Sequence, residues 1–210
     1  MTSRLSRCTK GRVITKAIGD ACKTSKSHFW SFLLFKLIRE FKPSTCLELG
    51  TALGISACYQ AAALKLNQAG NLTTLEGADS LALLAKQHFQ ALGLDNVRVV
   101  IGRFQDTLDE VLNRQQPIDY AFVDGHHDEK ATLDYFEQLA PFLSERAMLI
   151  LEDISWSERM KRAWSAMEAD SRVRISIDLE TVGICIINNC MKRKQSCKIP
   201  LQRRSRIVTL

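Results

Sequence analysis

Short apolar runs alternate with longer segments of helical periodicity along most of the chain. Five runs rich in Val, Ile and Leu are each bounded by turn residues, which is the pattern of buried strands. They lie at residues 45–49, 72–75, 97–101, 118–123 and 147–151. Continuous apolar strands separated by helical segments predict a parallel sheet with helices on both faces.

Apolar residues recur three and four positions apart in the segments around these runs, which predicts amphipathic helices. We expect helices at residues 27–41, 54–67, 79–92, 105–114, 129–139 and 157–169, with Thr24 or Ser25 as a cap for the first. The later runs 173–177 and 182–187 lie too close together for a helical crossover, so they should pair antiparallel. The predicted fold is α/β: a doubly wound, Rossmann-like sheet of seven strands, mostly parallel, with a C-terminal antiparallel hairpin.

The composition suits one globular domain, because the chain has 210 residues of which 46% are hydrophobic. We assign residues 27–190 to this domain. Residues 1–26 contain seven Lys and Arg and one Asp, and residues 191–210 contain seven and no acid. Since the net charge is +6, the body between them carries about −7.

The two basic ends have more than one interpretation. We expect residues 1–26 to be flexible or to form a lid, and residues 191–210 to be a disordered, solvated tail. A basic tail also suits nucleic acid or an acidic membrane surface. Nucleic acid is not the partner we favour, but the basic ends leave it open.

Other classes are excluded or disfavoured by what the chain lacks. No apolar run reaches the roughly 20 residues of a membrane span, and the first residues lack the apolar core of a secretory signal. The seven cysteines are odd in number and scattered, without the spacing of a metal site. Cys46, Cys58 and Cys185 fall inside apolar elements, so we expect buried thiols and a cytoplasmic protein.

The most informative stretch runs from Cys46 to Ser56, where the first predicted strand passes through Gly50 and Gly54 into an Ala-rich helix. Glycine lets the backbone turn sharply and lets a ligand approach the main chain. The first amides of the helix offer unpaired N–H groups to a negative group. The stretch therefore predicts a small-ligand cradle at the carboxyl end of the first strand.

Two acidic residues narrow the kind of ligand. Glu48 lies inside an apolar strand, where a carboxylate is costly unless it is satisfied. It is either a structural carboxylate that accepts backbone N–H bonds or a partner for a cationic group of a ligand, and we favour the second. Glu76, after the second strand, is placed to hold both hydroxyls of a ribose. A cradle with an acid and helix amides suits an amino-acid zwitterion better than a pyrophosphate.

The ordered set of motifs resembles class I S-adenosylmethionine-dependent methyltransferases. The stretch ELGTALGIS at residues 48–56, followed by TLEG at 74–77, resembles their first two motifs. FVDGHH at residues 122–127 resembles the DGxH segment of the O-methyltransferase-like branch, and LEDISWS at 151–157 resembles a segment in a group of uncharacterised bacterial proteins of that branch. The resemblance covers about residues 27–188 and implies methyl transfer, with a hydroxyl of a small molecule as the acceptor.

The resemblance also implies cofactor contacts. Gly50, Thr51 and Gly54 would shape the loop around the methionine part of S-adenosylmethionine, with Glu48 near its ammonium group, Ser56 on its carboxylate and Asp124 near the ammonium and sulfonium. Glu76 and Gly77 would hold the ribose, and Gly102 to Phe104 would pack the adenine, with the Phe104 ring as a wall.

The resemblance implies a metal as one option. Many relatives bind a divalent cation through an Asp after strand four and an Asp-Asn pair after strand five. Asp124, Glu152 and Asp153 occupy these positions here, and three oxygen donors suit Mg²⁺ or another divalent cation. The alternative is that Glu152 and Asp153 cap the next helix and face water.

The catalytic base is the remaining assignment. His127 lies where metal-dependent relatives place a lysine near the substrate hydroxyl, and a neutral imidazole can accept that proton. His127 and the carboxylate Asp153 are our catalytic candidates, although His127 also has a structural interpretation. Two other classes stay open: an NAD-dependent oxidoreductase, and a non-catalytic or RNA-associated protein that keeps the fold. The assembly is open as well, and includes a homodimer.

Overall fold

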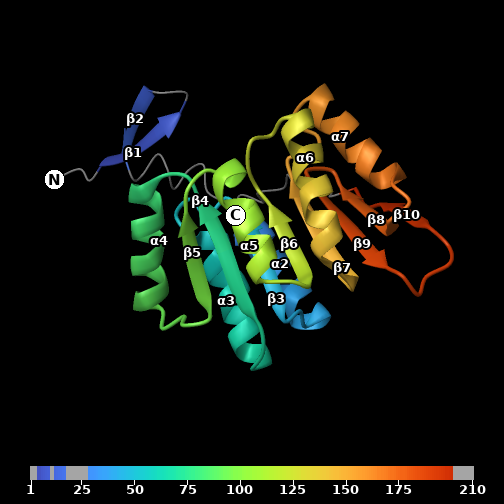
Figure 1. The fold of residues 1–210 in the computed structure, drawn as a ribbon, viewed down its shortest axis with the longest axis horizontal. Helices are drawn as coiled ribbons and strands as arrows, with labels where there is room; N and C mark the ends of the chain where they lie inside the picture. The colour runs from blue at the N-terminus through green and yellow to red at the C-terminus, as the bar shows by residue number, and fades with distance from the viewer. Residues whose placement is uncertain (1–3, 10–11, 18–27, 201–210) are drawn as a thin grey trace, which may run out of the picture.

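The computed structural model describes residues 4–9, 12–17 and 28–200, the first two ranges by their backbone only. Eight strands form one sheet in the order β10-β8-β9-β7-β6-β3-β4-β5 (Figure 1). The strands are β3 (Thr45–Leu49), β4 (Asn71–Glu76), β5 (Val97–Ile101), β6 (Ile118–Val123), β7 (Leu143–Glu152), β8 (Val173–Leu179), β9 (Val182–Asn188) and β10 (Gln195–Lys198). Strands β3 to β7 are parallel, and β9 is antiparallel to both β7 and β8.

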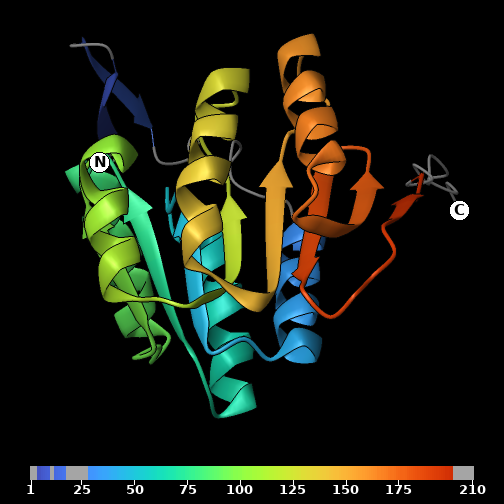
Figure 2. The ribbon, with the colours of Figure 1, turned by 45° about the vertical axis from the view of Figure 1, so that its right-hand side comes forward.

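Helices cover both faces of this sheet, as the continuous apolar strands predicted. One face carries α2 (His28–Phe41), α3 (Ile55–Asn67) and α4 (Asp79–Ala91), and the other carries α5 (Phe104–Arg114), α6 (Glu129–Leu139) and α7 (Glu158–Ala169). A 3-10 turn, η1 (Ala140–Phe142), follows α6. Figure 2 shows α6 and α7 in front of the sheet and α2 and α3 behind it. The doubly wound, Rossmann-like fold is therefore confirmed.

Alternation along the strands divides the core between the two faces. In β3, Leu47 and Leu49 pack toward α5 and α6, whereas Cys46 lies with the α2 and α3 cluster. Successive side chains of a strand point to opposite faces, so Glu48 points toward α3. Trp164 is buried at 6% exposure, and a Cβ on Gly183 would lie 2.4 Å from its ring. The glycine in β9 therefore makes room for the tryptophan of α7.

Strand β10 corrects two predictions. The sheet has eight strands rather than seven, and residues 195–198 are a strand rather than disordered tail. The strand pairs parallel with β8, and Lys198 forms an ion pair of 3.1 Å with Asp178. The carboxylate of Glu168 accepts the hydroxyls of both Ser176 and Ser196. Strands are recognised in a sequence by an apolar run. The sequence of β10 has no such run, and all four of its residues are exposed. Residues 201–210 of the predicted tail lie outside the described residues.

The N-terminal residues form a second, small sheet that the sequence did not predict. Strands β1 (Arg4–Thr9) and β2 (Arg12–Ala17) pair antiparallel, and β1 lies against α4. This hairpin lies at the opposite edge of the molecule from β10 (Figure 1). The predicted caps Thr24 and Ser25 lie outside the described residues. Within those residues, no helix has the length and apolar character to cross a membrane.

Candidate functional site

The predicted site residues gather where the sheet changes direction. From β3 the chain winds outward through β4 to β5, and from β6 it winds the other way to β7, so the loops after β3 and β6 diverge. Ligands of open α/β sheets bind at this switch point. A Cβ on Gly50 would lie 2.1 Å from the Asp124 carbonyl oxygen, and the Asp124 N–H donates to Leu49 O at 2.9 Å. The two loops are therefore in direct contact at their starts.

The loop after β3 is held by its own main chain. The N–H groups of Gly50 and Thr51 both donate to Leu75 O, each at 3.1 Å. Gly50 and Gly54 have φ values of 111° and 75°, which favour glycine, and a Cβ on Gly54 would be 2.9 Å from Phe89. Helix α3 begins at Ile55, so its first amides face the end of this loop.

Glu76 connects two loops of the site. Its carboxylate accepts the N–H of Ala52 at 2.8 Å and the N–H of Ala78 at 2.9 Å, and its side chain is buried. Its main-chain oxygen accepts the N–H of Gly102, which is the first residue after β5. The next residue, Gly77, is exposed, and a Cβ there would meet nothing closer than Gly102 O at 3.9 Å.

The buried Glu48 carboxylate is satisfied by protein side chains, rather than by the backbone N–H groups that the structural alternative expected. The carboxylate is fully buried. It accepts hydrogen bonds from Ser56 Oγ at 2.6 Å, from Gln60 Nε2 at 2.7 Å and from Thr74 Oγ1 at 2.6 Å. Burial raises its pKa to about 7, although the three hydrogen bonds oppose this shift. Ser56, which we expected beside a ligand carboxylate, donates its hydroxyl hydrogen to Glu48.

Phe104 lies in the core rather than at the surface. Its ring is 9% exposed and packs edge-on against His126 and Tyr135, at centroid distances of 5.6 and 5.8 Å. A Cβ on Gly125 would lie 2.7 Å from the same ring. The expectation that this ring forms a wall for adenine is therefore not supported. The Phe104 ring instead packs against Gly125 and His126 in the loop after β6.

The loops after β6 and β7 bring the catalytic candidates together. His127 Nδ1 lies 3.6 Å from Asp153 Oδ2, and both side chains are about one-third exposed. Both residues have left-handed backbones, with φ values of 35° for His127 and 55° for Asp153. Trp156 lies beside them, with its ring 6.5 Å from the His127 ring and 72% of the residue exposed. The His127 imidazole, the Asp153 carboxylate and the exposed Trp156 indole thus lie next to one another.

The predicted metal centre is not assembled. No three His, Cys, Asp or Glu side chains within the described residues are arranged to hold a metal ion. Asp124, Glu152 and Asp153 follow neighbouring strands, as expected, but the left-handed backbone of Asp153 places its carboxylate beside His127. In this structure the three carboxylates are therefore not gathered around one point as a ligand set.

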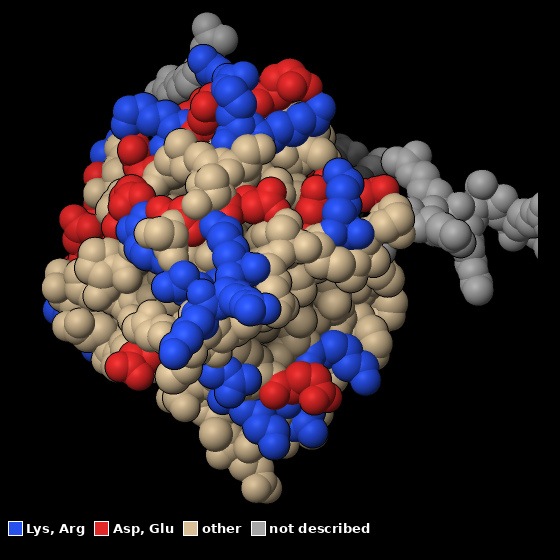
Figure 3. All heavy atoms as spheres, turned by 90° about the vertical axis from the view of Figure 1, so that its right-hand side faces the viewer, with Lys and Arg blue, Asp and Glu red and all other residues tan. Residues whose placement is uncertain are grey.

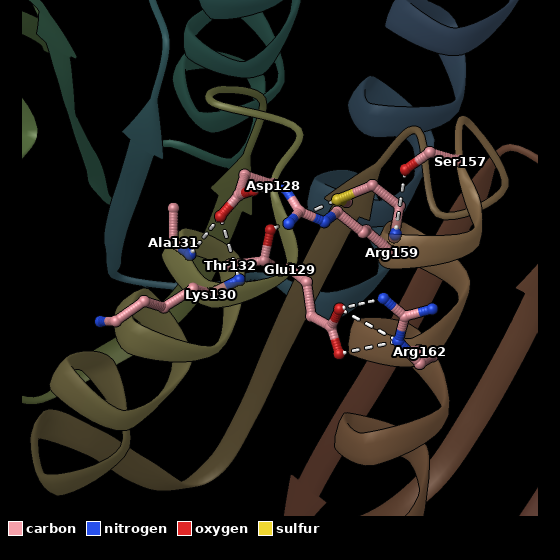
Figure 4. Close-up of polar contacts among 9 residues, drawn as sticks. Asp128, Glu129, Lys130, Ala131, Thr132, Ser157, Arg159 and Arg162 are labelled. Atoms are coloured by element: carbon pink, nitrogen blue, oxygen red, sulfur yellow. Dashed lines mark hydrogen bonds and ion pairs between the residues drawn. The ribbon is translucent and has the colours of Figure 1, made fainter.

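Ion pairs connect the helices that follow these two loops (Figure 4). Asp128 caps α6, accepting the N–H groups of Lys130 and Ala131, and its other oxygen lies 3.3 Å from Arg159 of α7. Glu129 accepts two nitrogens of Arg162, the shorter contact being 2.6 Å. A shallow, open depression of about 540 Å³ lies here, lined by Asp128, Glu129, Lys130, Leu133, Asp134 and Arg159. His127 immediately precedes Asp128, the N-cap residue of α6.

Three features were missed by the sequence interpretation. Gln60 and Thr74 complete the shell around Glu48, and the arginines of α7 connect the two loops. The signal for Gln60 was its place four residues after Ser56 on an otherwise apolar helix, because such residues share one face. Thr74 lies opposite Glu48 in the pairing of β3 with β4, which the sequence alone could not align.

Comparison with known proteins places this geometry in a family. The family model described as "Methyltransferase domain" matches residues 47–154, and the chain belongs to that family. The matched residues run from β3 to the start of the loop after β7, so they include the switch point. A comparison with curated proteins found no match.

Solved structures share the fold at low sequence identity. An O-methyltransferase from Bacillus cereus, in complex with SAH, is 21% identical, with a TM-score of 0.68 over 81% of this chain and 86% of that one. The O-methyltransferase TomG from Streptomyces achromogenes, in complex with SAM, is 22% identical, with a TM-score of 0.67 over 78% and 82%. The SAH-bound methyltransferase PaMTH1 from Podospora anserina is 18% identical, with a TM-score of 0.67 over 79% and 80%.

Proposed function

We propose that this protein is an S-adenosylmethionine-dependent O-methyltransferase that acts on a hydroxyl group of a small molecule. The observation that carries the proposal is the position of Glu76, beside the glycine loop of the switch point and directly before the exposed Gly77. Family membership supports methyl transfer, and neighbours of the same fold were solved with SAM or SAH.

The residues present fit an amino acid joined to a nucleoside. Glu76 would hold the ribose beside Gly77, and the first amides of α3 would hold the carboxylate of the methionine part. Gly50, Thr51 and Gly54 would shape the loop after β3 around the methionine part of the cofactor. Asp124 would bind its ammonium group. Gly102 follows β5, where the adenine would lie. When bound, the cofactor supplies a methyl group that is already activated on a sulfonium.

His127 and Asp153 would complete the reaction. An acceptor hydroxyl must lose its proton as the methyl group is transferred. His127 Nε2 would accept this proton, while Asp153, close to Nδ1, would orient the ring and stabilise its charged form. Trp156 offers an apolar surface for the acceptor next to this pair. In this proposal His127 and Asp153 move the proton without a divalent cation, because Asp124, Glu152 and Asp153 do not assemble as ligands.

The cellular setting is part of the proposal. Cys46 and Cys185 are buried free thiols, and free cysteines are typical of reducing compartments. We place the enzyme in the cytoplasm, with a small molecule as its acceptor.

The test is calorimetric binding of S-adenosylhomocysteine, with NADH as the comparison ligand. We expect wild-type protein to bind S-adenosylhomocysteine in the micromolar range, roughly −8 kcal/mol, and not to bind NADH. Glu76→Ala should weaken binding about tenfold or more, because it removes the ribose acceptor and two loop contacts. Lys86→Ala, an exposed substitution on α4, is the control and should bind like wild type. Binding of NADH alone, or of neither ligand, would overturn the proposal.

A further inference from the structure

Strand β10 and the residues before it carry an unusual excess of cations. Residues 191–200 contain Lys192, Arg193, Lys194 and Lys198 and no acidic residue. Lys198 is paired with Asp178, and Lys194 donates to the Asp170 main-chain oxygen at 2.7 Å. Lys192 and Arg193 are exposed and form no ion pair within the part of the chain that the structure describes.

Arg174 of β8 adds to this group. Gln195 pairs with Ile175, so the residues before β10 lie beside Arg174, which has no acidic partner among the described residues. We call Arg174, Lys192, Arg193 and Lys194 the basic edge. Figure 3 shows Lys and Arg side chains gathered near the middle of the face that carries this edge of the sheet.

The acidic side chains nearby are already engaged. Asp170 and Glu137 both bind the Arg172 guanidinium, at 2.7 and 2.6 Å. Glu168 accepts the hydroxyls of Ser176 and Ser196. These carboxylates hold the frame of β8, β10 and α7 in place. Lys194 lies against Asp170 of this frame, whereas Arg174, Lys192 and Arg193 have no acidic partner among the described residues.

The chemistry of this face favours repeated phosphates over other anions. Protein interfaces are usually anchored by a few buried aromatic or apolar residues, and amphipathic membrane helices by an apolar face. Ile199 is the one large exposed apolar residue between 170 and 200. Phosphates are bound by cations, main-chain N–H groups and polar side chains. The outer edge of β10 pairs with no strand among the described residues, and Gln195 is exposed on it. The sequence then continues with Arg203, Arg204 and Arg206.

We propose that the basic edge binds the phosphodiester backbone of a nucleic acid duplex without reading its bases. Residues 170–200 contain no Phe, Tyr or Trp, so this face lacks the rings on which unpaired bases stack. Binding that depends on cations alone is independent of sequence and strongly dependent on salt. The proposal goes beyond methyl transfer, and either can hold without the other.

The test is fluorescence anisotropy of a short, fluorescein-labelled RNA duplex titrated with the full chain over a range of salt concentrations. Wild-type protein should bind the duplex. The logarithm of the association constant should fall linearly with the logarithm of the salt concentration. In Lys192→Gln/Arg193→Gln the affinity should fall about tenfold or more, and the salt slope should become shallower by about two.

The matched control is Lys86→Gln/Arg98→Gln, which removes the same charge from exposed positions on α4 and β5 at the other edge of the sheet. It should leave the affinity within about twofold of wild type. Both variants should keep the thermal unfolding midpoint and the binding of S-adenosylhomocysteine. No binding by wild type, equal losses in the two variants, or binding only to phosphatidylserine vesicles would overturn the proposal.

Discussion

The α-carbon of Gly50 is so close to Asp124 that a Cβ at this position would lie 2.1 Å from the Asp124 carbonyl oxygen. Real side chains do not tolerate such an approach, and the φ of 111° adds its own strain. We expect Gly50→Ala to lower the free energy of unfolding by at least about 2 kcal/mol and to abolish measurable binding of S-adenosylhomocysteine. Urea unfolding and calorimetry check the two effects.

Two other glycines serve as controls for this prediction. Gly93 has a φ of 63° but open space around its Cβ, so Gly93→Ala should cost about 1 kcal/mol from backbone strain alone. Gly77 has neither a positive φ nor a close neighbour, so Gly77→Ala should leave stability unchanged. Equal losses in all three variants would contradict the role that we assign to the contact between Gly50 and Asp124.

Glu48 should give the protein a pH-dependent stability. Burial raises its pKa in the folded state to about 7, above the value of about 4.5 in the unfolded chain. The folded state therefore binds the proton more tightly, and stability should fall as pH rises from about 4.5 to about 7 and then level off. The loss is at most about 3 kcal/mol. Urea unfolding between about pH 5 and about pH 8 measures it.

Glu48→Gln removes the titrating group while keeping an amide of similar size. Its stability should be nearly flat over the same pH interval, because the remaining donors meet a neutral partner. Thr73→Val, on the neighbouring buried position of β4, should keep the wild-type slope. A variant slope as steep as that of wild type would assign the pH dependence to another group.

The pair of His127 and Asp153 should control the rate rather than cofactor binding. His127→Asn and Asp153→Asn suit the left-handed backbone of both positions, since Asn tolerates it. We expect His127→Asn to reduce the turnover of hydroxyl acceptors about a hundredfold or more, and Asp153→Asn to reduce it less. Release of S-adenosylhomocysteine measures turnover, and calorimetry should show unchanged cofactor affinity. A His127→Asn enzyme with full activity would exclude this residue as the base.

Removal of divalent cations by a chelator gives an independent prediction about the carboxylates near His127. Because Asp124, Glu152 and Asp153 are not arranged as a ligand set, we expect EDTA to leave turnover unchanged and added Mg²⁺ to have no effect. Activity that EDTA abolishes and Mg²⁺ restores would show that the three carboxylates rearrange around a cation.

The ion pair of Arg162 with Glu129 should position His127 without stabilising the fold much. The Arg162 side chain is 59% exposed and that of Glu129 is 30% exposed, so the pair is solvent-screened and Arg162→Gln should hardly change the urea midpoint. It should lower kcat more than it changes KM, because α6 begins directly after the loop of His127. The exchange Glu129→Arg/Arg162→Glu restores the pair with reversed charge and should recover most of the rate. Without such recovery, Arg162 would have another role.

Much of the fold was predictable because its signals are local and repeated. The strand Val97–Ile101 and the helix Glu129–Leu139 have the predicted bounds, since an apolar run and a 3.6-residue period each identify an element without long-range information. β10 could not be found in this way. Its exposed residues are held by Glu168 and Asp178, which are distant in sequence, and not by burial.

The candidate site was predictable in place but not in detail. Glycines and acids at the ends of strands indicated the switch point, because the carboxyl ends of parallel strands meet at one edge. The roles of Glu48 and Ser56 depend on register. Thr74 lies opposite Glu48, and Gln60 reaches the same carboxylate, so protein donors surround it. Likewise, only the left-handed backbone of Asp153 shows that its carboxylate faces His127.

The register of β10 determines where the chain leaves the sheet. Lys198 lies opposite Asp178, Asp178 opposite Gly183, and Gly183 opposite Leu151, so the four residues form one row across neighbouring strands. With about 4.8 Å between strands, the end of β10 lies about 15 Å from the end of β7, where Asp153 begins its loop. The end of β10 is thus on the same side of the sheet as the loop that carries Asp153, so a probe attached at Lys198 would report on that loop without being part of it.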